Sequence, residues 1–205
     1  MRVAVLISGG GSNMAALAAA HPAHIRLVLS NRPDAGGLDR ARALGIEALC
    51  LDHRAHGRDR AAHEAALDAI LRDRGIGLVC LAGYMRLLTP FLVGAWAGRM
   101  LNIHPSLLPL FPGLDTHARA LQAGVKLHGC TVHRVTEAVD AGSILAQAAV
   151  PVLPGDTPDT LAARVLVQEH RLYPAALGHI LHGTPGLSDP AAALLNPLPL
   201  APAGP

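Results

Sequence analysis

Short apolar runs rich in β-branched residues alternate along the chain with stretches in which apolar residues recur at helical spacing. The runs at 3–7, 25–30, 46–51 and 77–82 each predict a buried strand. Residues 14–20, 37–44 and 59–74 predict helices, and Gly45 and Gly75 end the last two of these. Strands that alternate with helices form right-handed crossovers. The pattern therefore predicts an α/β fold with a mainly parallel central sheet flanked by helices.

The second half of the chain continues this pattern with a strand that ends at His104, strands at 130–135 and 143–150, and a long helix at 157–181. Asp156 or Thr157 is expected to cap that helix, and Pro174 to bend or interrupt it. We expect a single Rossmann-like domain over residues 1–183, with a phosphate-binding half at 1–100 and a catalytic half at 101–183. A Pro-rich tail at 184–205 is assigned no function.

Composition narrows the class of protein. The 205 residues are 51% hydrophobic and carry a formal net charge of +2, with no basic run. Only two Phe, two Tyr and one Trp are available for base stacking, so no nucleic-acid partner is expected. The chain shows neither a signal peptide nor an apolar run long enough to cross a membrane. We expect a cytoplasmic protein with no membrane partner.

Three widely separated cysteines, Cys50, Cys80 and Cys130, lie in apolar, strand-like settings. This spacing predicts neither a disulfide framework nor a thiolate metal cluster. We therefore expect three buried thiols in a reducing compartment.

The segment Asn102-Ile103-His104-Pro105-Ser106-Leu107-Leu108-Pro109 predicts an active site. In an extended strand Asn102 and His104 share one face while Ile103 points into the core. Open parallel sheets bind ligands at the carboxyl ends of their strands. A carboxamide and an imidazole at that edge suit acyl transfer to an amine, because both stabilise a developing oxyanion and the imidazole also moves protons.

A lone acidic residue, Asp140, lies further along in Val139-Asp140-Ala141-Gly142. If it lies near His104, its negative charge favours the imidazolium and keeps a donor available. Without that pairing, Asp140 is a turn residue. Thr131 and His133 share a strand face and could support the site, although a purely structural role is the favoured interpretation of His133.

The loop Ser8-Gly9-Gly10-Gly11-Ser12-Asn13 joins the first strand to the first helix, and such loops cradle phosphate on free helix amides. Met14 stands where the dinucleotide fingerprint needs its third glycine, and no acidic residue clearly ends the second strand. A single phosphate held by Gly11, Ser12 and Asn13 therefore fits better than a dinucleotide. A tight turn without a ligand is the alternative.

Other chemistries have weaker support. Asp52, His53 and His56, and separately His21 and His24, have spacings that could begin a zinc site, but neither group has a further ligand in a suitable frame, so no metal is expected. No nucleophile elbow occurs, and no cysteine has a histidine neighbour in a loop. Direct attack by a substrate amine is the simpler mechanism.

Taken together, the motifs resemble the folate-dependent formyltransferases that act on glycinamide ribonucleotide. The resemblance covers residues 1 to about 181, and its most specific part is the octapeptide with the later Asp140. It also rests on the glycine loop, Leu81-Ala82-Gly83-Tyr84-Met85-Arg86-Leu87-Leu88, Pro112-Gly113-Leu114 and Gln168-Glu169-His170.

The resemblance implies transfer of the formyl group of 10-formyltetrahydrofolate to the amine of 5'-phosphoribosylglycinamide (GAR) in purine biosynthesis. It implies that Asn102, His104 and Asp140 are catalytic. Gly11, Ser12 and Asn13 would bind the phosphate, and Glu169 the ribose hydroxyls. The folate would contact Asn102 and Asp140, and the resemblance adds Arg60, Met85, Arg86, Leu87, Leu88 and Val139. Both substrates are small molecules, and we expect a monomer or weak homodimer.

Three other functions remain open. The nearest is 10-formyltetrahydrofolate deformylase, a hydrolase with the same trio that usually carries an extra amino-terminal domain; the first strand here begins at residue 3. Transfer to aminoacyl-tRNA calls for a basic carboxyl-terminal domain, whereas this tail is almost uncharged. A catalytically inactive nucleotide-binding module would bind phosphate without any turnover that depends on His104.

Overall fold

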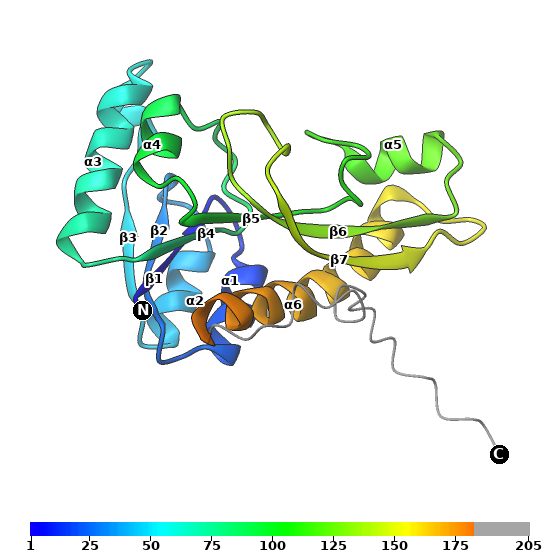
Figure 1. Ribbon diagram of the computed structural model, residues 1–205, viewed down its shortest axis with the longest axis horizontal. Coiled ribbons are helices and arrows are strands. Elements are labelled where there is room, and N and C mark those ends of the chain that lie inside the picture. The colour runs from blue at the N-terminus through cyan, green and yellow to red at the C-terminus, as the bar shows by residue number, and fades with distance from the viewer. Residues whose placement is uncertain (183–205) are drawn as a thin grey trace.

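A computed structural model describes residues 1–182, which form one seven-stranded sheet with the order β3-β2-β1-β4-β5-β6-β7 (Figure 1). The strands are β1 Val3–Ile7, β2 Ile25–Ser30, β3 Glu47–Cys50, β4 Leu78–Leu81, β5 Met100–His104, β6 Leu127–Arg134 and β7 Ile144–Pro151. The helices are α1 Ser12–Ala20, α2 Gly37–Ala43, α3 Arg60–Asp73, α4 Pro90–Ala95, α5 Thr116–Gln122 and α6 Pro158–His182, with a 3-10 turn η1 at His53–His56. The expected tail at 184–205 lies outside the described residues.

The sheet is parallel from β3 to β5, whereas β6 and β7 are antiparallel additions at one side. Alternate residues of β1 enter different cores: Val3, Val5 and Ile7 pack against α1, α2 and α6, while Ala4 and Leu6 pack against α3 and α4. A strand covered on both faces must be apolar throughout, and all five residues of β1 are buried. The predicted α/β class and mainly parallel sheet are confirmed.

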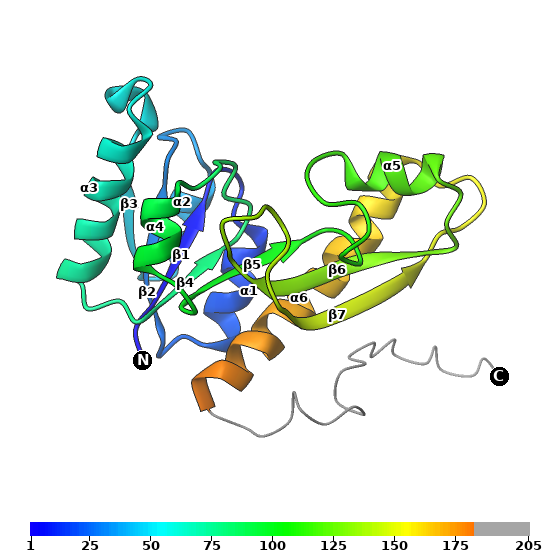
Figure 2. The same cartoon turned by 45° about the horizontal axis from the view of Figure 1, so that its top comes forward.

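The ribbon formed by β6 and β7 extends beyond the parallel strands, with α5 and its preceding loop on one side and α6 on the other (Figures 1 and 2). Helix α6 continues through Pro174, so this proline does not interrupt it. The hydroxyl of the buried Tyr173 lies 3.1 Å from the Leu81 carbonyl and 3.2 Å from the Leu101 carbonyl. This contact ties α6 to the two central strands that lead into the predicted site.

Some expectations need correction. Helices α4 and α5 were not predicted. Cys80 and Cys130 are buried, but Cys50 is exposed because it ends β3, the edge strand, which has a neighbour on one side only. Thr157 does cap α6, since its Oγ1 accepts a hydrogen bond from the Thr160 amide at 3.2 Å.

Within residues 1–182 no helix is both long and apolar enough to cross a membrane.

Candidate active site

The site is built where the parallel strands meet the antiparallel ribbon. Asn102 and His104 leave the same face at the carboxyl end of β5, and the register with β6 sets His133 opposite Asn102 and Thr131 opposite His104. His104 is 5% exposed. Pairing with β6 therefore supplies two further polar side chains beside the predicted pair.

Asp140 comes to this edge on the loop between β6 and β7. Its Oδ2 lies 3.3 Å from His104 Nδ1 and accepts the Gly113 amide at 2.8 Å. Its Oδ1 lies 3.6 Å from His133 Nε2. Gly142 lets the chain return to the sheet, since a Cβ at this position would meet the Arg134 carbonyl oxygen at 1.8 Å. The structure thus brings Asn102, His104 and Asp140 together.

The His104 ring has an acceptor at each nitrogen. Nδ1 faces the Asp140 carboxylate, and Nε2 donates to the Phe111 carbonyl at 3.0 Å. A carbonyl oxygen and an ionised carboxylate only accept hydrogen bonds. Each nitrogen of the His104 ring therefore points at a group that can only accept a hydrogen bond.

His133 contacts the site directly, contrary to the interpretation favoured from sequence. Its Nδ1 donates to the Arg134 carbonyl at 3.0 Å. Burial lowers the pKa of His133, although that hydrogen bond and the charge of Asp140 oppose the shift. In the neutral ring Nε2 is an acceptor, and it receives the Asn102 carboxamide, whose Nδ2 lies 3.2 Å away. His133 therefore turns the amide group of Asn102 to one side and leaves its second N–H free.

A buried network holds the loop that follows His104. The Thr131 hydroxyl donates to the Ser106 carbonyl at 2.7 Å and accepts the Leu108 amide at 3.0 Å. Gln147 Nε2 donates to the Leu108 carbonyl at 2.8 Å. Sequence reasoning did not identify Gln147, and no local motif marks it; its part depends on the pairing of β6 with β7.

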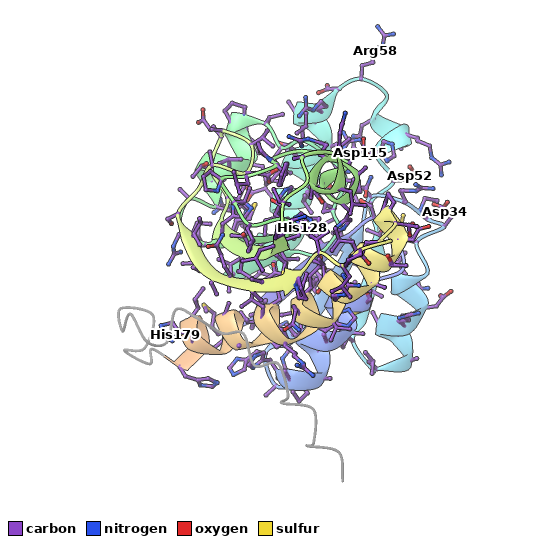
Figure 3. All side chains as sticks on the ribbon, turned by 90° about the vertical axis from the view of Figure 1, so that its right-hand side faces the viewer. Asp34, Asp52, Arg58, Asp115, His128 and His179 are labelled. Atoms are coloured by element: carbon purple, nitrogen blue, oxygen red, sulfur yellow. The ribbon has the colours of Figure 1, made fainter. Side chains whose placement is uncertain are left out.

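A second imidazole pair lies under the loop before α5. His128 Nε2 is 3.2 Å from His117 Nδ1, and the Phe111 ring lies edge-on to His128. Figure 3 shows His128 at the end of the molecule that carries α5 and Asp115, with α6 crossing below. Burial, reinforced by the nearby His117, lowers the pKa of His128 to about 4.

The lowered pKa makes folding depend on pH. Between pH 6.5 and 4 the unfolded chain binds a proton at His128, whereas His128 in the folded chain stays neutral. The contribution of His128 to the free energy of unfolding is therefore complete above this pH range and is lost as the pH falls through it. We expect His128 alone to lower the free energy of unfolding by about 2 kcal/mol between pH 7 and pH 5. Urea unfolding at both pH values measures it; His128→Asn should show a smaller loss than wild type, and an equal loss would refute the assignment.

The glycine loop has the geometry of an anion cradle. Gly11 takes the left-handed conformation at the start of α1, φ 70°, and a Cβ there would meet the Gly37 Cα at 2.9 Å. The first amides of a helix have no intrahelical acceptor. Asn13 Nδ2 donates to Glu169 Oε2 at 2.6 Å, and burial raises the pKa of Glu169. The predicted phosphate and ribose residues therefore meet between α1 and α6.

Most of the predicted folate residues lie on two loops, whereas Arg60 begins α3 and Asn102 lies on β5. Met85, Leu87 and Val139 are large apolar side chains that are 67%, 64% and 55% exposed. Both views show the loop between β6 and β7 beside the segment that follows β4 (Figures 1 and 2). Arg60 Nη2 donates to the Leu87 carbonyl. Arg60 thus holds the backbone of this segment.

The histidines considered for zinc have other partners. His53 Nδ1 lies 2.8 Å from the Asn31 carbonyl, and His21 Nε2 lies 2.8 Å from the Pro174 carbonyl. Among residues 1–182 no group of three or more His, Cys, Asp or Glu side chains is arranged to hold a metal ion.

The chain is similar to proteins of a known family. A family model described as formyl transferase matches residues 1–177. The trifunctional purine biosynthetic protein adenosine-3 of Bos taurus is 48% identical over 193 residues, 92% of this chain. The chain spans only 19% of that relative's length. Phosphoribosylglycinamide formyltransferase of Escherichia coli (strain K12) is 43% identical, over 94% of this chain and 92% of the relative.

The solved structure of phosphoribosylglycinamide formyltransferase from Brucella melitensis is 56% identical to this chain. It superimposes with a TM-score of 0.84 over 89% of this chain and 96% of that one. The fold and the matched residues define a formyl transferase, and the chain belongs to that family. The resemblance to the phosphoribosylglycinamide formyltransferases is confirmed as well, since relatives of that name match nearly the whole described chain.

Proposed function

We propose that the protein transfers the formyl group of 10-formyltetrahydrofolate to the amine of GAR, giving formyl-GAR and tetrahydrofolate in purine biosynthesis. The observation that carries the proposal is the pairing of His104 with Asp140 at 3.3 Å, beside Asn102 on the same strand. The named relatives are formyltransferases or a purine biosynthetic protein, which favours transfer to an amine over hydrolysis.

In this mechanism the neutral amine of GAR attacks the formyl carbon. A carbon–nitrogen bond forms, and the π-electron pair of the carbonyl moves onto its oxygen. The product of this step is a tetrahedral intermediate with an oxyanion. The free N–H of Asn102 and the Nε2–H of His104 stabilise that oxyanion. The bond from the formyl carbon to folate N10 then breaks, and a proton from the attacking amine passes to N10, with Asp140 and His104 relaying it through water.

The formyl oxygen takes the place of the Phe111 carbonyl at His104 Nε2, because a single N–H cannot serve both well. Asp140 remains at Nδ1 and balances the imidazolium charge. Neutral His133 supports the same step, since it holds one N–H of Asn102 and leaves the other for the substrate.

The backbone amides of Gly11, Ser12 and Asn13, together with the Ser12 hydroxyl, bind the phosphate of GAR at the start of α1. Glu169 accepts hydrogen bonds from the ribose hydroxyls while keeping its contact with Asn13. Met85, Arg86, Leu87, Leu88 and Val139 line the folate pocket, and Arg60 and Arg86 lie toward its anionic benzoylglutamate end.

Glu169→Ala should raise the KM for GAR by about 10- to 100-fold, the usual cost of losing a hydrogen bond to a charged group. Asn13 also loses its partner in this variant. Steady-state kinetics with each substrate varied in turn measure the effect, and the folate KM should stay near the wild-type value. Glu169→Gln retains an acceptor for Asn13, so its KM for GAR should rise less than that of Glu169→Ala. Equal rises in the KM values for GAR and folate would contradict a ribose site at Glu169.

Formyl transfer itself is tested with 10-formyltetrahydrofolate labelled with ¹³C in the formyl group. NMR should show the label moving into the amide of formyl-GAR. Label found as free formate would instead establish hydrolysis and refute the proposal.

A further inference from the structure

Residues 82–89 connect β4 to α4 and contain no helix or strand, yet hydrogen bonds fix them at Met85, Leu87 and Thr89. The Met85 amide donates to Ser8 Oγ at 2.8 Å, and Arg60 Nη2 donates to the Leu87 carbonyl. At Thr89, two residues further on, the backbone amide donates to Glu64 Oε1 at 2.8 Å and the hydroxyl donates to Glu64 Oε2. The segment is anchored at one end to Ser8, the residue that follows β1, and along the rest to α3.

Glu64 is the strongest of these anchors. It is 3% exposed, and both of its oxygens accept from Thr89. A buried carboxylate is costly unless its oxygens are hydrogen-bonded, so Glu64 and Thr89 fix each other. Arg60 lies one helical turn earlier on α3 and faces the same way. One face of α3 therefore holds the segment at Leu87 and Thr89.

The anchored backbone presents apolar side chains outward. Met85 and Leu87 alternate with the more buried Arg86 and Leu88, and both are more than 60% exposed. Exposed apolar side chains on a fixed backbone suit a preformed wall for an apolar ligand face, because no ordering is needed on binding.

We infer that Glu64 is a positioning residue for the folate co-substrate. Through its hydrogen bonds to Thr89, it holds residues 85–88 in place as a preformed wall of the folate pocket. This inference rests on the proposed function for the identity of the ligand. Substitution of Glu64 has two effects on folate binding, and they are of opposite sign. Removing a negative charge near the anionic folate should by itself strengthen binding, whereas loss of the wall's anchor should weaken it.

The test is direct titration of tetrahydrofolate, which carries no formyl group and cannot react, into wild type and variants by calorimetry. We expect Glu64→Gln to raise the Kd by about tenfold, since the amide nitrogen of Gln cannot accept from Thr89. Thr89→Val keeps the charge, loses one donor and should raise the Kd by about threefold. Asp73→Asn removes an exposed charge from the same helix and should leave the Kd unchanged.

In turnover assays the folate KM of Glu64→Gln should rise with the Kd, while kcat and the GAR KM stay within about twofold. Unchanged or tighter tetrahydrofolate binding by Glu64→Gln or Thr89→Val would overturn the inference, as would an equal rise in both KM values. If Glu64→Gln does not fold, Thr89→Val decides alone. Failure of wild type to formylate GAR while the Kd pattern holds would reject the proposed function and leave the positioning role of Glu64 standing.

Discussion

His104→Ala should lower kcat by about a thousandfold while the protein stays folded and binds both substrates. The variant loses the Nε2 donor to the oxyanion and the proton relay to Asp140 together, and each effect alone is worth on the order of a hundredfold or more. Steady-state turnover of 10-formyltetrahydrofolate with GAR measures it, with binding of each substrate followed separately.

His182→Ala is the matched control, because His182 is exposed at the end of α6. It should retain wild-type kcat. A His104→Ala enzyme that turns over within tenfold of wild type would show that Asn102 and the bound substrates supply most of the catalysis, and would remove His104 from its assigned role.

Asp140→Asn should lower kcat by about a hundredfold. Its amide oxygen can still accept from Gly113 and face His104 Nδ1, but the neutral side chain no longer places a negative charge beside the ring. Its N–H₂ group then lies toward His133 Nε2. Steady-state kcat with both substrates at saturating concentration measures this loss.

Asp115→Asn provides the comparison for Asp140→Asn. Both residues have left-handed backbone angles, φ 55° and φ 52°, and Asn tolerates that conformation as well as Asp does. Asp115 is exposed, so its variant should keep the wild-type kcat. Equal losses in the two variants would indicate loop distortion and not the missing charge at Asp140.

Much of the fold follows from periodicity alone. Strands β1 and β4 are apolar and buried throughout, and α3 shows clear helical spacing between Asp59 and Gly75. Helices α4 and α5 were not predicted because they span six and seven residues, too few for a period of 3.6 to stand out. The signal for α4 was Pro90 at its first position after Thr89.

The candidate site was predictable where local geometry decides it. Strand alternation puts Asn102 and His104 on one face, and Gly142 permits the close return of the Asp140 loop. The contact of His133 with Asn102 depends on the register between β5 and β6, which the sequence of either strand does not specify.

Backbone partners and buried anchors were the least predictable parts. The Phe111 carbonyl and the Gly113 amide reach His104 and Asp140 through the path of a loop, so no side-chain type marks them. Glu64 lies within an amphipathic helix, where a carboxylate usually faces water. Its burial becomes visible only once the segment at Thr89 is packed against α3.

Formyl transfer to GAR is tested most directly by the rate of tetrahydrofolate formation from 10-formyltetrahydrofolate, followed by absorbance with and without GAR. We expect turnover only when GAR is present, one tetrahydrofolate for each formyl-GAR, and loss of this turnover in His104→Ala. Turnover at the same rate without GAR would identify a deformylase, and no turnover in either condition would contradict the roles assigned to Asn102, His104 and Asp140.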